Sequence, residues 1–102
     1  MAIMEISIVP IGKGPSLSAY VADCIRVLKA SGLPYELTAM GTNIEGPLKD
    51  LLRVAHKMHQ APFRKGVGRV LTTIKIDDRR DKKGTLQGKK KAVQRKLRKK
   101  GN

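Results

Sequence analysis

Aromatic residues are scarce in this chain, and the scarcity limits how its interior can be built. Of 102 residues only Tyr20, Tyr35 and Phe63 are aromatic, and tryptophan is absent. Because large aromatic side chains cannot fill this core, it must be built from aliphatic ones. A chain of this length supports one modest domain, and domains this small often complete their burial by associating with further copies.

Cysteine and long apolar runs are also scarce. A single cysteine, Cys24, excludes an internal disulfide and suits a reducing cytosol. The apolar segment over residues 1–9 is too short for a secretion signal or a membrane span, and it runs into Pro10 and Gly12. We therefore expect a cytoplasmic protein with no membrane partner.

Acidic residues are missing from the last fifth of the chain. Residues 82–102 contain ten Lys or Arg and no acid, whereas the first 81 residues hold twelve basic and eight acidic side chains, a net of +4. We therefore divide the chain into a domain over 1–81 and a basic C-terminal helix over 82–102. Leu86, Val93 and Leu97 form a narrow apolar seam on that helix. It can pack on the body or on another subunit, or it can bind polyanions non-specifically.

Hydrophobic periodicity predicts two helices and four strands in the body. Helix signals are Ser16 or Ser18 as an N-cap, Gly32 as a C-terminal stop, and Pro47 at the start of the second helix. Strands are expected over 3–9, 35–41, 42–45 and 68–77, and helices over 17–31 and from 47 to Pro62. This order predicts an α+β ferredoxin-like split βαβ sandwich, with a four-stranded antiparallel sheet and both helices on one face.

The last expected strand shows that one face of the sheet is polar. Its even positions, such as Ile74 and Ile76, are largely apolar, whereas its odd positions include Thr73, Lys75 and Asp77. Glu5 and Glu36 should lie on the same open face and can pair with its basic residues. Such a face meets water, a ligand or another subunit.

Two polar features near the helices are candidate binding groups. Thr42 and Glu45 lie at the two ends of a very short strand, ahead of the second helix, and can orient a small polar ligand. Glu45 is equally explained as a carboxylate favoured by the helix dipole. His59 lies on the predicted apolar stripe formed by Leu48, Leu51, Leu52 and Ala55, where a hydrogen-bonded core histidine is the alternative to a ligand-binding one.

Nothing in the sequence indicates catalysis or a metal. There is no HExxH motif, and His56 and His59 have no further ligand to complete a metal site. Cys24 lies on the apolar stripe of the first helix, which is typical of a core residue. We therefore expect a non-enzymatic protein without a metal or cofactor.

Several short motifs together resemble the YkoF-like thiamine-binding protein family over residues 3 to about 80. Met40-Gly41-Thr42 followed at this distance by Lys75-Ile76-Asp77-Asp78-Arg79 is the most specific part. The remaining matches are Pro10-Ile11-Gly12, residues 16–21, Glu45-Gly46, His59 and Arg69-Val70. The tail is far more basic than the resemblance requires.

The resemblance implies a ferredoxin-like fold, homodimers or homotetramers built through the sheets, and binding of thiamine or its hydroxymethylpyrimidine moiety without catalysis. On that basis the small molecule is expected to contact seven side chains: Ser18, Tyr20, Met40, Thr42, Glu45, His59 and Asp77. The alternative function is that of a small nucleic-acid-associated protein that acts through its basic C-terminal helix.

Overall fold

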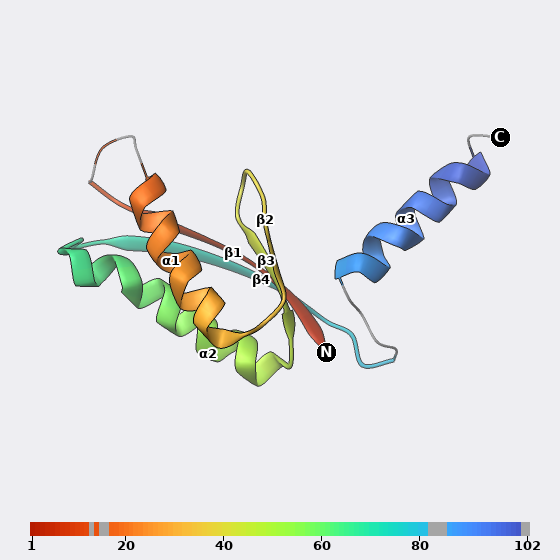
Figure 1. Ribbon diagram of the computed structural model, residues 1–102, viewed down its shortest axis with the longest axis horizontal. Helices are drawn as coiled ribbons and strands as arrows, with labels where there is room; N and C mark the ends of the chain where they lie inside the picture. The colour runs from red at the N-terminus through yellow and green to blue at the C-terminus, as the bar shows by residue number, and fades with distance from the viewer. Residues whose placement is uncertain (13, 15–16, 82–85, 101–102) are drawn as a thin grey trace.

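The computed structural model describes residues 1–12, 14, 17–81 and 86–100 (Figure 1). In this part of the chain four strands form one antiparallel sheet in the order β2-β3-β1-β4. This is the predicted split βαβ arrangement. The elements are β1 (Ala2–Pro10), α1 (Ser18–Ser31), β2 (Tyr35–Leu37), β3 (Thr42–Gly46), α2 (Leu48–Gln60), a 3-10 helix (Ala61–Lys65), β4 (Val70–Asp78) and α3 (Leu86–Lys100).

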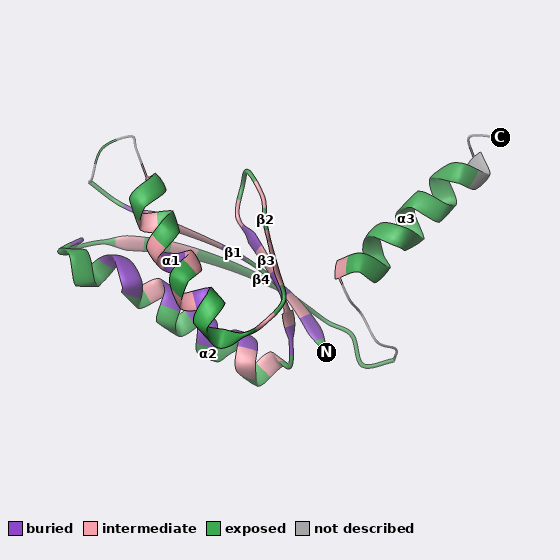
Figure 2. Cartoon of the chain, viewed as in Figure 1, coloured by how far each residue is buried: buried purple, intermediate pink, exposed green. Residues whose placement is uncertain are grey.

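The register of the sheet confirms the prediction that one face is apolar and covered by helices. Met4 pairs with Ile76 and Ile6 pairs with Ile74, so the even positions of β1 and β4 share the face that α1 and α2 cover (Figure 1). Met4 and Ile6 are buried there with Leu28 of α1 and Leu51 of α2. Buried residues gather between the sheet and these helices (Figure 2), and this core is aliphatic, as expected.

The opposite face of the sheet is open in the single chain and mixes charge with apolar groups. Lys75 pairs with Glu5 in the register, and their charged atoms are 4.0 Å apart, as the predicted cross-strand pairing requires. Leu71 also lies on this face and is 58% exposed. We call this side of the sheet the open face; it carries Glu5, Glu36, Glu45, Leu71, Thr73, Lys75 and Asp77.

Helix boundaries differ in detail from the sequence prediction. The N-cap of α1 is Leu17, without a side-chain hydrogen bond, and Ser18 is already helical; Ser16 lies outside the described residues. Gly32 ends α1 in the left-handed conformation with φ of 75°, as predicted. Pro47 is the N-cap of α2 and not its first helical residue, because its ψ of 141° is extended.

The buried stripe of α2 is rotated relative to the predicted one. Leu51, Val54, Ala55 and Met58 are buried, whereas Leu52 is 49% exposed. The spacing of the four buried residues places them on one side of a helix. All four buried residues are apolar, whereas the predicted stripe included Leu52, which is half exposed, and ended in the polar His59.

The second strand is shorter than the sequence suggested, because a local turn interrupts it after Leu37. The Thr38 hydroxyl donates to the Gly41 carbonyl at 2.9 Å and accepts from the Gly41 N–H at 3.1 Å. Such local bonds compete with a strand ladder. A Cβ at Gly41 would lie 2.9 Å from the Ile6 carbonyl oxygen, so only glycine allows the turn to approach β1 this closely.

The basic helix α3 starts at the open face and then projects away from the body (Figure 1). The Leu86 N–H donates to Glu45 Oε2 at 2.9 Å, and Lys89 and Lys90 pair with Asp77 and Glu36. Hydrogen bonding from Lys90 lowers the pKa of the Glu36 carboxyl below its ordinary value. Beyond these contacts the helix is exposed along its described side chains (Figure 2). No helix among the described residues has the length and apolar character needed to cross a membrane.

Candidate ligand pocket

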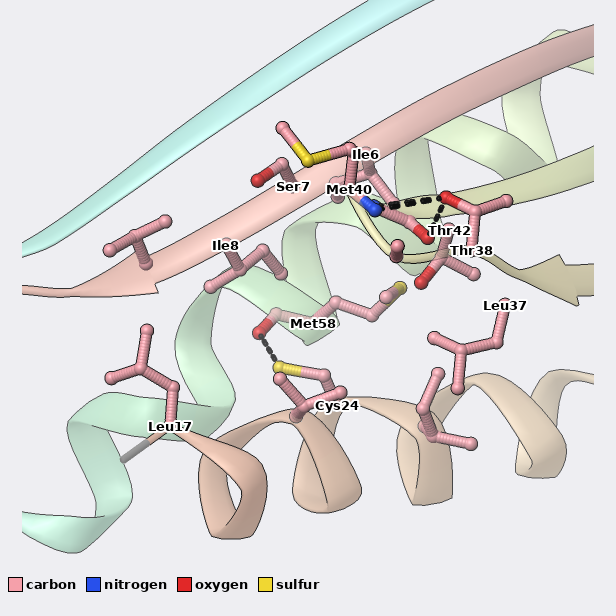
Figure 3. A pocket seen from close by; sticks show the side chains of 15 residues that line it. Ile6, Ser7, Ile8, Leu17, Cys24, Leu37, Thr38, Met40, Thr42 and Met58 are labelled. Carbon is pink, nitrogen blue, oxygen red and sulfur yellow. Dashed lines mark hydrogen bonds between the residues drawn. The ribbon is translucent and has the colours of Figure 1, made fainter. Parts of the chain in front are cut away.

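A cavity of about 210 Å³ lies between α1, β1 and the β2–β3 turn (Figure 3). The helix side supplies apolar groups such as Val21 and Met58, and the sheet side supplies Ile6, Ile8 and Thr42. The turn over residues 38–41 forms the remaining wall. None of the described residues that line it is an Asp, Glu, Lys, Arg or His: Ile6, Ser7, Ile8, Val9, Leu17, Val21, Cys24, Ile25, Leu37, Thr38, Ala39, Met40, Gly41, Thr42 and Met58.

The hydroxyl of Thr42 is the central polar group of this cavity. Thr42 pairs with Ile6, so its side chain points to the helix side of the sheet, and the residue is only 5% exposed. Within the described part of the chain its hydroxyl has no hydrogen-bond partner, whereas the Thr38 hydroxyl is occupied by the turn. No side-chain oxygen among the described residues is both fully buried and without a partner, so the Thr42 hydroxyl is accessible from the cavity. A ligand in the cavity can supply the hydrogen-bond partner that this hydroxyl lacks within the protein.

Cys24 forms part of the cavity wall but is a poor nucleophile. Its Sγ atom lies 3.5 Å from the Met58 carbonyl oxygen, to which the thiol donates, and the residue is 5% exposed. Burial raises the pKa of the Cys24 thiol to about 11, and the neighbouring Asp23 carboxylate adds to the shift. The thiol is therefore protonated near neutral pH, which agrees with the predicted core role.

Of the seven side chains expected to bind a ligand, the cavity brings together only Met40 and Thr42. Met40 is at the tip of the turn and is 84% exposed. Ser18 and Tyr20 lie in the first turn of α1, outside the cavity lining, although their neighbours Leu17 and Val21 belong to it. The Tyr20 ring is 5.9 Å from the Lys65 ammonium.

His59 is a partly buried structural residue at the end of α2. A hydrogen bond of 2.6 Å joins its Nδ1 to Thr72 Oγ1 on β4, and its ring packs edge-on against Phe63 at 5.5 Å between centroids. These contacts tie α2 to the sheet. They support the alternative of a hydrogen-bonded core histidine, and His59 does not line the cavity.

The two predicted carboxylates are on the other side of the sheet from the cavity. Glu45 is three residues after Thr42 in the same strand, and an odd separation reverses the face. Asp77 shares the face of Glu45, since both are directly opposite Ile3. Thr42 and Glu45 therefore do not orient one ligand together, and both carboxylates instead contact α3.

Most of the cavity wall was not predicted from the sequence. Cys24 was predicted to be a core residue of the first helix, but nothing in the spacing of that apolar stripe shows that part of it, including Val21 and Ile25, borders a cavity. Thr38 was expected inside a strand. The signal that could have found the site is the sequence Thr38 to Thr42, which combines two hydroxyls with Gly41.

Known proteins resemble this chain over most of its length. A family model described as thiamine-binding protein matches residues 4–94, which is most of the chain. The chain belongs to this family. UPF0045 protein YqgV of Bacillus subtilis is 52% identical over 95% of this chain and 98% of its own length. A UPF0045 protein of Staphylococcus xylosus is 47% identical over the whole of both chains.

Solved structures show the same fold. The crystal structure of protein MJ1052 from Methanocaldococcus jannaschii has a TM-score of 0.84 and 41% identity, covering 90% of this chain and 94% of that one. A putative thiamine biosynthesis/salvage protein from Thermotoga maritima, TM0486, has a TM-score of 0.73 over 86% of this chain and 92% of that one. Its identity of 18% supports the shared fold alone.

The state of Cys24 leads to a test by alkylation. We expect iodoacetamide to modify Cys24 in the folded protein at pH 8 more than about 100-fold more slowly than in the urea-unfolded chain, because burial restricts access and a raised pKa removes thiolate. The rate should rise as the pH approaches 11 while the chain stays folded. Rapid modification of the folded protein at pH 8 would contradict the buried position of this thiol.

Proposed function

We propose that this protein binds thiamine or its hydroxymethylpyrimidine moiety in the cavity between α1 and the sheet, and that it performs no chemistry on the ligand. The observation that carries the proposal is the hydroxyl of Thr42, which has no hydrogen-bond partner within the described part of the chain and borders a mostly apolar cavity. Membership of the thiamine-binding protein family supports the ligand class.

The chemistry of the cavity suits an aminopyrimidine ring. Such a ring is flat and carries a donor amino group beside acceptor ring nitrogens, and a hydroxyl can both donate and accept. Ile8, Val21 and Met58 supply apolar surface for its faces. A few polar groups in an apolar cavity are the usual pattern of a small-molecule site.

Size and charge favour the pyrimidine moiety over intact thiamine. The cavity of about 210 Å³ is smaller than the range of about 300–1,000 Å³ that is typical for drug-sized ligands. The thiazolium of thiamine is a cation, and none of the described lining residues is a carboxylate that could compensate for its desolvation. A single uncharged ring is small enough for this volume and needs no carboxylate to compensate for its desolvation.

The same lining supports binding without catalysis. General acid–base catalysis needs a titratable group within hydrogen-bond reach of the ligand, and none of the described lining residues carries a carboxylate, an imidazole or an ammonium group. Cys24 is its one thiol, and a pKa of about 11 keeps this group protonated. The single free cysteine also suits a reducing compartment, so we propose a cytoplasmic location.

Isothermal titration calorimetry tests the ligand and the site together. We expect hydroxymethylpyrimidine to bind more tightly than thiamine, and Thr42→Val to weaken binding about tenfold, since a ligand group left without its partner costs about 1–3 kcal/mol. Valine keeps the shape of threonine but not its hydroxyl.

The matched control is Thr73→Val, which removes a hydroxyl from an exposed residue on the open face. It should leave the affinity unchanged. Absence of heat with either compound at millimolar ligand would refute the ligand class, and equal losses in the two variants would refute the site.

We further propose that copies of this chain associate through the open face into dimers or tetramers. Leu71 is 58% exposed on this face, and its strand partner Val9 is only partly buried. Ile3, further along β1 on the same face, is also only partly buried. Val93 and Leu97 of α3 are 58% and 64% exposed. A small domain gains most from covering such groups.

Sedimentation equilibrium measures this association. We expect an assembled wild-type protein and a lower mass for Leu71→Lys, because an ammonium would be buried without a partner in the interface. Leu52→Lys is the matched control, since Leu52 is 49% exposed but lies on α2, away from the open face. A monomeric wild type, or equal dissociation of the two variants, would contradict the proposal.

A further inference from the structure

The outward part of α3 has a row of cations that the body leaves unpaired. Lys89 and Lys90 are neutralised by Asp77 and Glu36 where the helix starts. Lys91, Arg95 and Arg98 come next, and none of them pairs with an acid in the described part of the chain. They are exposed and border one shallow hollow together with Gln94, so they share a side of the helix.

This row is separate from the apolar seam of the same helix. Leu86, Val93 and Leu97 recur at spacings of seven and four residues. Lys91 is five residues after Leu86, which places it about 140° around a helix of 3.6 residues per turn. The seam can therefore pack against another subunit while the row stays accessible to a different partner.

We propose that Lys91, Arg95 and Arg98 bind the phosphate backbone of nucleic acid without sequence preference. Their positions span seven residues, or about 10 Å along the helix axis, a length over which a duplex presents several phosphates. The helix projects from the body, so an extended polyanion can pass along it without meeting the sheet (Figure 1). Charge complementarity is strong, because residues 82–102 contain no acid.

The chemistry of α3 favours nucleic acid over an anionic membrane. Helices that lie in a membrane interface carry a wide apolar face, often with aromatic residues. The apolar seam of α3 consists of only three residues, with lysines between them in the sequence. It includes no aromatic residue. The absence of aromatics from α3 also means that bases cannot stack on it, which limits recognition to the backbone.

Fluorescence anisotropy with a labelled DNA duplex of mixed sequence tests the proposal on the full-length protein. We expect log Kobs to fall linearly with log salt between about 50 and 200 mM. A variant with Lys91→Gln, Arg95→Gln and Arg98→Gln should bind far more weakly. Its salt slope should be smaller in magnitude by about 3, one for each lost phosphate contact.

The matched control is a variant of α2 with Lys49→Gln, Arg53→Gln and Lys57→Gln. It removes the same charge from exposed positions at similar helical spacing. It should keep the wild-type salt slope to within about 1. Hydroxymethylpyrimidine titration of both variants shows whether the cavity is intact, and it separates a failure of this proposal from a failure of the proposed ligand function.

Three outcomes would overturn the proposal. They are no binding of the duplex at about 50 mM salt, equal losses in the α2 and α3 variants, and binding to anionic phospholipid vesicles without binding to the duplex. Retained binding by the α2 variant with loss in the α3 variant would support it.

Discussion

The alternation of side chains across β1 and β3 is the constraint on which the rest of the structure depends. Met4, Ile6 and Ile44 must face the helices to be buried, and full burial of each such side chain contributes about 1.5–3 kcal/mol. Once they do so, Thr42 is fixed on the helix side and Glu45 on the open face. The two sides of the sheet then differ in character: one borders the cavity, whose described lining residues are uncharged, and the other carries charged groups.

This separation resolves an apparent conflict in the sequence. A strongly basic protein does not attract a cationic vitamin at long range, but none of the described lining residues of the cavity is charged, and the cavity is suited to an uncharged ring. The positive charge is concentrated on α3, whose start is held by acids of the open face. The proposed ligand binding and the proposed contact with polyanions therefore use different parts of the molecule.

Strong local signals made much of the fold predictable. The period-two pattern of β4 and the cap at Gly32 depend on near neighbours in the sequence, and both are present as expected. The early end of β2 was not predictable, because it depends on the Thr38 hydroxyl and on the close approach of Gly41 to Ile6. The candidate site was predicted only at Met40 and Thr42. Its other walls arise where α1 lies against that turn, which no local pattern specifies.

The most direct test of the account is to map the ligand by NMR on the full-length protein. Titration of the ¹⁵N-labelled chain with hydroxymethylpyrimidine should shift the amide signals of Cys24, Gly41 and Thr42, which border the cavity. The signals of Glu45 and Asp77 should move little. Shifts centred on those two carboxylates would contradict the account, because the ligand would then occupy the open face and not the cavity.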